Sequence, residues 1–497
     1  MLCGLLEKSV LTHPDKIAIN FGEHQITYKK ALEVIHKLAK GLSDSGVEKG
    51  ERVAILLPNT PHFIFTYYAV LNIGGVVVTL NTLSHLDELS LVMNETAPHT
   101  IIVWDKLYGR IRKLNYNFKN VFVLGDNVPK SSKSLTALIS QSSEDKPQVD
   151  INPDDIAQIQ YTPGIVNAPK GVALSHENLT FSAQSIINFF ATSDNDIYAG
   201  ILPLFLLYAQ NFIMNPALLQ GAKLMLYPRL DIEALNKAVY EDKVTYMAGS
   251  PTIYSMLSEN AAEAKKDHAL RYSLSYGSAC GQQLLSDFEQ KFDCPILEGY
   301  GVTETTSVIS YTPSAVEKKP NSVGIVFSGV EVKIVDKNRN DLAPGELGEI
   351  AVSGKNVMDS YWNRAELTAE LVEGNWFYTG DVGKLDEEGY LYYTDRKNDV
   401  IHKSGFNIFP VEIEEMLLEH PKIKEVAVIG MQHPKHKEEV KACVVLKEGE
   451  KTTTEEIIEF CKQKVPVYKC PQLIQFYESL PKNSTGRILK RKLHEQI

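Results

Sequence analysis

A six-residue segment, Gly299 to Glu304, joins an aromatic ring, two glycines, a hydroxyl and a carboxylate. The ring of Tyr300 could stack on a nucleobase. Thr303 and Glu304 could then face phosphate and Mg²⁺, since carboxylate oxygens are ligands that this ion accepts. Taken alone, the segment favours a simpler interpretation, a helix that begins at Thr303 as its N-cap.

A second segment, 161–172, lies between a predicted strand and a predicted helix. It contains Thr162, Gly164, Lys170 and Gly171. A glycine-containing loop with a lysine, placed between strand and helix, is where phosphate can meet backbone N–H groups. By itself the pattern is more typical of a plain turn, because proline and glycine both favour one.

A third region holds acids and an arginine that could bind a sugar. Asp381 closes the run Trp376 to Asp381, and a short acid of this kind can accept both ribose hydroxyls. Arg396 lies in the segment 395–399 and could fork onto ribose or phosphate oxygens. Between them, residues 386–389 are predicted to form a hairpin turn.

The fourth segment, 480–491, is rich in lysine and arginine and includes Arg487. In isolation this pattern favours a solvated basic helix at the C-terminus. Any chemical role for Arg487 therefore depends on the other three segments.

The elements that must position these segments alternate between short β-branched runs and helical patterns. Strands are predicted at 53–57, 100–103, 121–124, 158–161, 223–226 and 245–248, and helices at 27–44 and 232–241. Such alternation predicts α/β architecture with largely parallel sheets. The polar stretch 126–155 is predicted to be an exposed connection.

The last hundred residues repeat this theme on a smaller scale. Helices are predicted at 411–419 and 454–464, and strands at 425–429, 441–446 and 473–476. A chain of 497 residues is too long for one core, so these elements predict a compact second domain.

Composition and charge exclude several classes of protein. Hydrophobic residues make up 44% and charged residues 23%, which is typical of a globular chain rather than a disordered or fibrous one. The net charge of −11 gives no general attraction to nucleic acid or anionic lipid. The six cysteines are scattered and form no zinc motif, which favours a reducing cytoplasm.

The N-terminus lacks a signal-peptide pattern, and the apolar stretch 63–80 predicts a helix, a turn and a strand rather than a membrane span.

Together, in this order and at these spacings, the four segments resemble the adenylate-forming superfamily of acyl-CoA synthetases, firefly-type luciferases and adenylation domains. The resemblance covers nearly the whole chain and is most specific over 376–414. It is closest to the medium- and long-chain fatty acyl-CoA ligases, judged by the sequence Gly-Phe-Asn-Ile at 405–408, Pro410, Glu412 and Glu414. The resemblance implies a large N-terminal domain of α/β sheets (1–394), a hinge (395–399) and a small, mobile α+β C-terminal domain (400–497).

The resemblance also implies a two-step reaction that uses ATP, Mg²⁺ and either CoA or a phosphopantetheine carrier. A carboxylate first attacks the α-phosphate of ATP to give acyl-AMP, and a thiol then displaces AMP. Carried over by position, the nucleotide contacts are Thr162, Gly164, Lys170, Gly171, Gly277, Ser278, Ala279, Tyr300, Thr303, Asp381 and Arg396, with Glu304 as the Mg²⁺ ligand. The acyl-pocket positions are Phe205, Leu206, Tyr208, Ala209 and Gly301, Gly405 lies on the thiol path, Asn398 is at the hinge, and Arg487 is at the catalytic position.

The phosphate loop departs from the family pattern Tyr-Thr-Ser-Gly-Thr-Thr-Gly-x-Pro-Lys-Gly. This chain has Pro163, Ile165, Val166 and Asn167 at the serine, the two threonines and the following glycine. Three hydroxyl donors and one backbone N–H are thereby lost. Because hydrogen bonds to charged groups contribute about 1.5–3 kcal/mol each, phosphate contact should be weaker by several kcal/mol.

Four other positions differ from the family. Arg487 stands where the catalytic lysine is expected, and its longer, planar side chain need not reach the same oxygens. By analogy with one displaced donor, the penalty is about 2.7–4 kcal/mol, or 100- to 1,000-fold. Asn398 replaces the usual Asp or Lys, while Leu206 and Ala209 replace His and Gly and make the acyl entrance more apolar and narrower.

These departures leave two hypotheses open. In the first, the chain is an acid–thiol ligase for a fatty or other apolar carboxylic acid, and this one is favoured because the ribose, adenine and magnesium elements are intact. In the second, it is an adenylation-deficient homologue that binds an acyl ligand or acyl-AMP, performs only thiol transfer, or serves as a non-catalytic partner. A dinucleotide-dependent enzyme is disfavoured because no Gly-x-Gly-x-x-Gly follows the first strand. A metal-dependent hydrolase is disfavoured because the histidines are dispersed.

Overall fold

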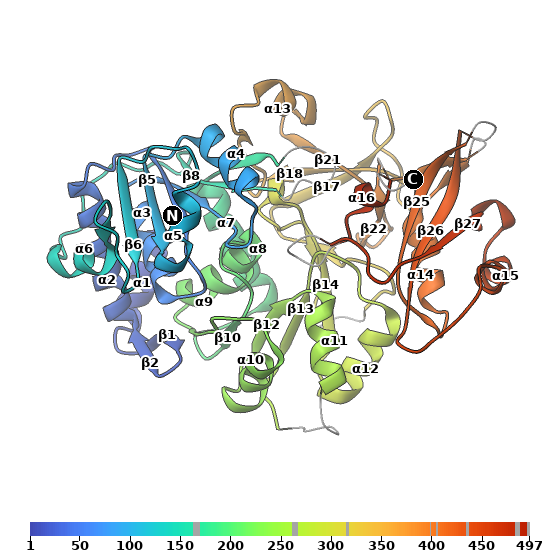
Figure 1. Ribbon diagram of the computed structural model, residues 1–497, viewed down its shortest axis with the longest axis horizontal. Coiled ribbons are helices and arrows are strands. Elements are labelled where there is room, and N and C mark those ends of the chain that lie inside the picture. The colour runs from blue at the N-terminus through green and yellow to red at the C-terminus, as the bar shows by residue number, and fades with distance from the viewer. Residues whose placement is uncertain are drawn as a thin grey trace.

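The computed structural model describes residues 1–162, 169–260, 267–314, 318–397, 399–403, 406–433, 437–482 and 488–494. A large N-terminal domain is joined to a smaller C-terminal lobe, which carries β25, β26 and β27 (Figure 1). The predicted α/β class with a large and a small domain is confirmed.

The first sheet of the large domain has eight strands in the order β19-β9-β8-β4-β3-β5-β6-β7. Its strands are β3 (Arg52–Leu56), β4 (Val76–Thr79), β5 (Thr100–Trp104), β6 (Asn120–Leu124), β7 (Lys133–Ser134), β8 (Ile156–Tyr161), β9 (Gly171–Ser175) and β19 (Ser360–Tyr361). The run from β8 to β7 is parallel, whereas β9 and β19 are antiparallel to their neighbours. The associated helices are α1 (Leu2–Thr12), α2 (Tyr28–Asp44), α3 (Pro61–Asn72), α4 (Leu86–Thr96), α5 (Asp105–Ile111) and α6 (Leu135–Gln141).

The second sheet has nine strands in the order β16-β15-β14-β13-β12-β10-β11-β1-β2. Its strands are β1 (Ile17–Phe21), β2 (His24–Thr27), β10 (Ile197–Gly200), β11 (Lys223–Leu226), β12 (Tyr246–Gly249), β13 (Tyr272–Ser275), β14 (Ile296–Tyr300), β15 (Ser310–Tyr311) and β16 (Ile325–Val326). Its α-helices are α7 (His176–Phe190), α8 (Leu207–Ala209), α9 (Asn215–Leu219), α10 (Ile232–Asn236), α11 (Pro251–Asn260) and α12 (Gln282–Phe292). Two π-helical turns, η1 (Gln210–Met214) and η2 (Lys237–Glu241), and a 3-10 turn, η3 (Thr303–Thr305), complete it. Since β12, β13 and β14 are parallel, their carboxyl ends open on one edge, where ligands of α/β sheets bind.

A third, antiparallel sheet completes the large domain, in the order β17-β18-β21-β20 with β22 against β21. Its elements are β17 (Val330–Val335), β18 (Gly348–Gly354), β20 (Val372–Glu373), β21 (Trp376–Leu385), β22 (Leu391–Arg396) and α13 (Ala365–Leu371). The predicted hairpin turn at 386–389 connects β21 to β22 and is confirmed, with Gly389 at φ +82°.

The C-terminal lobe has its own sheet, β24-β23-β26-β25, with β27 against β26. Its elements are β23 (Ile401–Lys403), β24 (Phe406–Ile408), α14 (Pro410–Leu418), β25 (Ile423–His433), β26 (Lys437–Leu446), α15 (Thr454–Lys464), η4 (Val467–Lys469), β27 (Leu473–Phe476) and α16 (Lys490–His494). One apolar cluster includes Ile413, Val428 and Ile457, and a second includes Ile429 and Leu493. These clusters are separate from the core of the large domain, as expected for a second folding unit.

Local sequence explains where the main helices begin. Thr27 caps α2 by accepting a hydrogen bond from the backbone N–H of Lys30. At α7, the Ser175 hydroxyl accepts from the Asn178 N–H, and the Asn178 side chain accepts from the Ser175 N–H, which is a reciprocal capping box. This cap fixes α7 immediately after the strand that follows the phosphate-loop segment.

The expectation that 126–155 is only an exposed connection is wrong, because β7 and α6 lie within it. Leu135 is fully buried, and Leu138 packs beside Gly41 of α2. The two leucines are three residues apart and so share one helix face. The stretch 63–80 is divided between α3 and β4 as predicted. In the described part of the chain, no helix has the length and hydropathy needed to span a bilayer.

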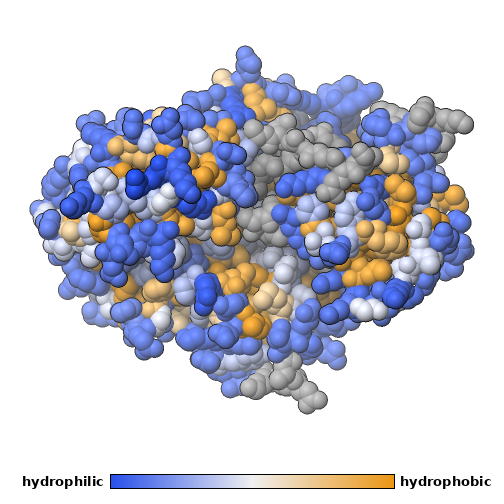
Figure 2. Space-filling view, viewed as in Figure 1, coloured by the Kyte–Doolittle hydropathy of each residue, from blue (hydrophilic) through white to orange (hydrophobic). Residues whose placement is uncertain are grey.

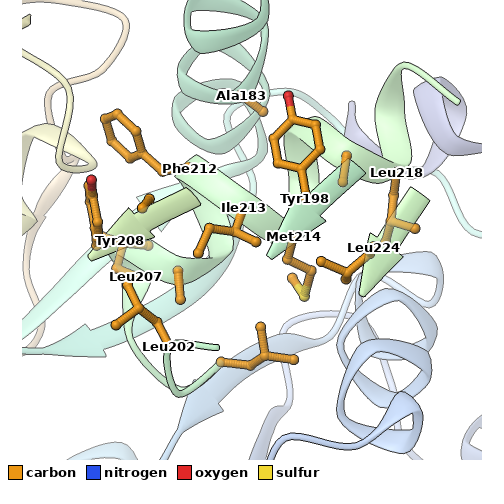
Figure 3. Packing of buried hydrophobic residues seen from close by; sticks show 14 of the residues in the cluster. Ala183, Tyr198, Leu202, Leu207, Tyr208, Phe212, Ile213, Met214, Leu218 and Leu224 are labelled. Atoms are coloured by element: carbon orange, nitrogen blue, oxygen red, sulfur yellow. The ribbon is translucent and has the colours of Figure 1, made fainter. Parts of the chain in front are cut away.

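Buried apolar side chains join the second sheet to its covering helices (Figure 3). Tyr208 and Phe212 lie at one side of this cluster, and Leu218 and Leu224 lie at the other. The turn η1 interrupts the helical segment between them, and such π-helical turns often mark functional sites. On the outer face of the molecule, hydrophilic side chains predominate and apolar patches are scattered among them (Figure 2).

Candidate active site

Three residues that are distant in sequence meet at the end of β14. The Tyr300 hydroxyl donates a 2.6 Å hydrogen bond to Oδ2 of Asp381. Nε of Arg396 lies 3.4 Å from the other carboxylate oxygen of Asp381. Asp381 and Arg396 face each other in the register of β21 and β22, so the hairpin itself sets their separation. We name these three residues the ribose triad, after the ribose contact that the sequence predicts for Asp381 and Arg396.

The ribose triad is a buried carboxylate with a buried donor on one side and a cation on the other. Asp381 is 2% exposed. Burial raises the pKa of Tyr300 well above its ordinary value, and the Asp381 carboxylate raises it further, so this hydroxyl stays a donor. Burial alone would lower the pKa of Arg396, but the Asp381 carboxylate together with Tyr393, Tyr300 and Glu304 outweighs this effect, and the pKa is raised. Near neutral pH Tyr300 therefore stays neutral and Arg396 stays positively charged.

Glu304 is held beside the flanks of the phosphate loop through Tyr361. The Tyr361 hydroxyl donates a 2.7 Å hydrogen bond to Oε1 of Glu304. The ammonium of Lys170 lies 5.1 Å from the centre of the same tyrosine ring, within cation–π range. Tyr361 pairs with Val172 between β19 and β9, which explains how one ring touches both groups. Sequence reasoning missed Tyr361, because a two-residue strand gives no periodic signal.

The loop flanks themselves are pinned to each other. The Thr162 N–H donates to the Lys170 carbonyl at 3.0 Å, and the Lys170 N–H lies 3.4 Å from the Thr162 hydroxyl oxygen. The N–H of Trp362 donates to the carbonyl of Gly171 at 2.8 Å, next to Tyr361. Of the predicted phosphate contacts, Thr162, Lys170 and Gly171 thus lie together, while Gly164 is outside the described residues.

A tight turn after Tyr300 brings Gly301 and Thr303 to the same edge. A side chain at Gly301 would place its Cβ 2.4 Å from the carbonyl of Ser307, so only glycine fits there. Thr303 begins η3 and is partly exposed, as is Glu304. The predicted helix start at Thr303 is therefore a single 3-10 turn with Val302 as its N-cap.

The segment 277–279 borders the same edge from the neighbouring strand. Gly277, Ser278 and Ala279 follow β13 and are exposed. Gly277 has φ +96°, and nothing lies within 4 Å of the Cβ position it lacks. Its backbone therefore favours glycine through conformation rather than crowding. Since β13 and β14 are parallel neighbours, this exposed loop and Gly301 lie at adjacent strand ends.

The predicted acyl-pocket residues lie where the first and second sheets meet. The Phe205 carbonyl accepts a hydrogen bond from the Thr79 hydroxyl at 3.1 Å and one from the Gln160 amide at 3.4 Å. Tyr208 and Ala209 are buried, while Leu206 packs partly buried against the core. The polar contacts tie this loop to β4 and β8, so the first sheet holds the loop in position.

Comparison with known proteins now identifies the family. The family model of the AMP-binding enzymes matches residues 6–362, and that of the AMP-binding enzyme C-terminal domain matches 412–487. The chain belongs to the AMP-binding enzymes. The resemblance inferred from the four segments is thereby confirmed.

Relatives and solved structures agree with this assignment. The AMP-binding enzyme is 33% identical over 527 residues to a long-chain-fatty-acid–CoA ligase of Bacillus subtilis, covering 100% of this chain and 94% of the relative. It is 32% identical to a 2-succinylbenzoate–CoA ligase of Bacillus cereus, covering 99% and 98%. ATP-bound MatB from Rhodopseudomonas palustris superposes with a TM-score of 0.92 at 28% identity, covering 100% and 99%.

The AMP-binding enzyme matches the two MatB structures unequally. The TM-score is 0.92 against the ATP-bound form and 0.81 against the apo form, although both comparisons cover 100% of this chain and 99% of MatB. The arrangement of the described residues is therefore closer to the ATP-bound structure.

The C-terminal helix α16 packs against strand β25, and its Lys490 lies near Asp395 of β22. Lys490 of α16 forms a 2.9 Å ion pair with Glu414 of α14. Burial raises the pKa of Asp395 to about 6, although the Lys490 ammonium partly opposes this rise. The Asp395 carboxylate also accepts a 3.1 Å hydrogen bond from the backbone N–H of Val411. Since Asp395 adjoins Arg396 of the ribose triad, the tail is anchored next to the triad.

Four of the predicted functional positions lie outside the described residues: Gly164, Asn398, Gly405 and Arg487.

Proposed function

We propose that this AMP-binding enzyme activates an apolar carboxylic acid as acyl-AMP and transfers the acyl group to CoA. In the first step a carboxylate oxygen attacks the α-phosphorus of ATP, and pyrophosphate leaves. In the second step a thiolate attacks the acyl carbonyl carbon, and AMP leaves. The ribose triad is the observation that carries this proposal, because it offers a buried, fixed acceptor at the carboxyl edge of the second sheet.

In this proposal Asp381 accepts the two ribose hydroxyls, and Arg396 holds the charge of Asp381 in place. The ring of Tyr300 and the loop 277–279 border the adenine. Thr303 contacts phosphate from the start of η3. A hydroxyl pair bound to one ionised carboxylate forms charge-assisted hydrogen bonds, which are about twice as strong as neutral ones.

Glu304 suits a magnesium ion. Its carboxylate is partly exposed, and Tyr361 donates to one of its two oxygens. Mg²⁺ is usually bound by one or two carboxylates together with substrate phosphates and water. The residues present therefore fit the ion. When bound, Mg²⁺ would neutralise phosphate charge, while Lys170 supplies a second cation beside Tyr361.

We also propose CoA rather than a carrier protein as the thiol acceptor, on the strength of relatives named as CoA ligases. We place the reaction in the cytoplasm. All six cysteines are free thiols, which suits a reducing compartment.

The test separates the two half-reactions. Exchange of radiolabelled pyrophosphate into ATP, measured with a panel of carboxylic acids, should depend on both the acid and Mg²⁺. Because the phosphate loop lacks three hydroxyls and Arg487 replaces lysine, we expect slow exchange. Synthetic acyl-AMP mixed with CoA should give the thioester rapidly. Thioester formation without any exchange would show that activation is lost, and failure of both reactions would refute the proposal.

A further inference from the structure

Tyr276 lies between residues 205–209, which we call the acyl loop, and the turn that follows Tyr300. It follows β13 directly, and its ring stacks on Tyr208 with centroids 4.2 Å apart and planes only 10° apart. Its hydroxyl donates a 2.5 Å hydrogen bond to the carbonyl of Gly301. One side chain therefore bridges α8, at the acyl loop, and the turn that follows Tyr300.

The ring on which Tyr276 stacks has no room to move. Phe212 packs against Tyr208 with centroids 4.4 Å apart, and the hydroxyls of Tyr208 and Tyr311 lie 3.0 Å apart. Tyr311 in turn donates a 2.8 Å hydrogen bond to the carbonyl of Ser275. Tyr208 and Phe212 lie close together at the edge of the buried cluster in Figure 3. Tyr208 is 7% exposed and Tyr311 is 1% exposed, so this aromatic wall is part of the packed core.

Tyr276 itself is held at both ends of its side chain. Stacked aromatic pairs contribute about 0.5–1.5 kcal/mol beyond the area that they bury, and the hydroxyl bond fixes the direction of the ring. A substrate that displaced the ring would have to break both contacts. The ring is therefore a fixed wall rather than a swinging gate.

These contacts decide how much space an acyl group has. In the proposed reaction the acyl carbonyl joins the α-phosphate next to Thr303, and its body extends from Gly301 toward the acyl loop. The ring of Tyr276 spans this path, from Gly301 to Tyr208. The remaining loop positions are aliphatic or aromatic, namely Phe205, Leu206 and Ala209.

We infer that Tyr276 is a specificity-determining residue that shortens the acyl pocket, so that the enzyme takes a compact apolar carboxylic acid and not a long-chain fatty acid. This inference rests on the proposed function and narrows its substrate class. The inferred substrate class also differs from the one in the name of a 33% identical relative, a long-chain-fatty-acid–CoA ligase.

The experiment measures how affinity depends on acyl-chain length, and it does not require the protein to react with ATP. Non-hydrolysable acyl-sulfamoyl-adenosines with straight chains from about four to about sixteen carbons are titrated into the protein by calorimetry. Acyl-AMPs of the same lengths are mixed with CoA to compare thioester rates. The wild type should favour the shortest chains. Each methylene that does not fit is worth about tenfold or more in discrimination.

Two variants distinguish a pocket wall from a structural residue. Tyr276→Ala should raise the ratio of long-chain to short-chain affinity at least about tenfold, since it removes the ring. Tyr276→Phe is the matched control, because it keeps the ring, loses the hydroxyl bond to Gly301 and should keep the wild-type ratio. Tyr276→Leu takes the place of the alanine variant if that variant does not fold.

The outcomes are distinct for the two claims. A wild type that binds the analogues but favours the longest chains overturns the inference and leaves the proposed function standing. An alanine variant with the wild-type ratio of long-chain to short-chain affinity also overturns it, because a purely structural tyrosine would change all affinities in parallel. If no analogue binds, the proposed function fails, and the inference fails with it.

Discussion

Replacing Asp381 by asparagine tests the ribose triad most directly. The substitution keeps the size of the side chain and an oxygen that can accept from the Tyr300 hydroxyl. It removes the negative charge that faces Arg396 at 3.4 Å and that is proposed to accept the ribose hydroxyls. Two effects are therefore expected, one on nucleotide binding and one on stability.

The effect on binding follows from the kind of hydrogen bond that is lost. A hydrogen bond to a charged group contributes about 1.5–3 kcal/mol, and a neutral one contributes about 0.5–1.5 kcal/mol. Weakening two ribose contacts by about 1 kcal/mol each gives about 2 kcal/mol, or about a 30-fold higher Kd for AMP. Isothermal titration with AMP measures this Kd, and the KM for ATP in pyrophosphate exchange should rise in parallel.

The stability effect is modest because Arg396 keeps partial contact with solvent. Removing one partner from a fully buried ion pair costs about 3–5 kcal/mol. The side chain of Arg396 is 28% exposed, so part of this penalty is screened and about 2 kcal/mol is expected for Asp381→Asn. Urea denaturation measures the change in the free energy of unfolding.

A matched control lies at the opposite edge of the second sheet. Asp196 is 1% exposed and forms a 3.0 Å ion pair with Arg271 just before β10 and β13. Asp196→Asn should also lower stability but leave AMP affinity unchanged. If Asp381→Asn weakens AMP no more than this control does, Asp381 does not bind the ribose.

Two further predictions concern the tail and the strand beside it. Arg487→Lys should raise the rate of pyrophosphate exchange, up to about 100-fold if the lysine restores a displaced catalytic donor. An unchanged rate in a folded variant would show that Arg487 is not at the catalytic position. Burial raises the pKa of Asp395 from 3.8 to about 6, so between these pH values the folded chain keeps a proton that the unfolded chain releases. The stability that this proton gives is therefore complete below pH 3.8 and is lost as the pH rises through about 6. Relative to Asp395→Asn, the wild type should lose up to about 3 kcal/mol of unfolding free energy across this window, as followed by urea denaturation, and parallel curves for the two proteins would refute the shift.

Much of the fold could be predicted because apolar periodicity is local. The strand 223–226 and the helix 454–464 were predicted with their observed bounds, and 245–248 was displaced by one residue from β12. The predicted helix 232–241 is instead α10 followed by the π-helical turn η2. A π-helical turn keeps the chain helical and changes only which carbonyl each N–H meets, so side-chain periodicity does not distinguish it.

The candidate site could be predicted only in part. Tyr300 and Asp381 are 81 residues apart, and no local pattern joins them. They were named together because their segments resemble those of a family. Tyr361 and Tyr276 were missed because their roles depend on long-range contacts. Tyr276 had one usable signal, a bulky ring directly before the named residue Gly277. The hinge at 395–399 stays a prediction.

The distribution of departures from the family pattern has a physical explanation. The ribose triad is built on β14, β21 and β22, where strand register fixes each side chain and a substitution would disturb the packed core. The phosphate-loop substitutions fall in sequence between β8 and β9, and Arg487 precedes α16, all outside the described residues. Segments between strands and helices generally tolerate substitution at little cost to folding. Selection on stability alone would therefore preserve the triad whether or not the enzyme activates its substrate. The presence of Asp381 and Arg396 is therefore weaker support for nucleotide binding than a measured effect of Asp381→Asn on AMP affinity. Only that measurement separates an effect on binding from an effect on folding.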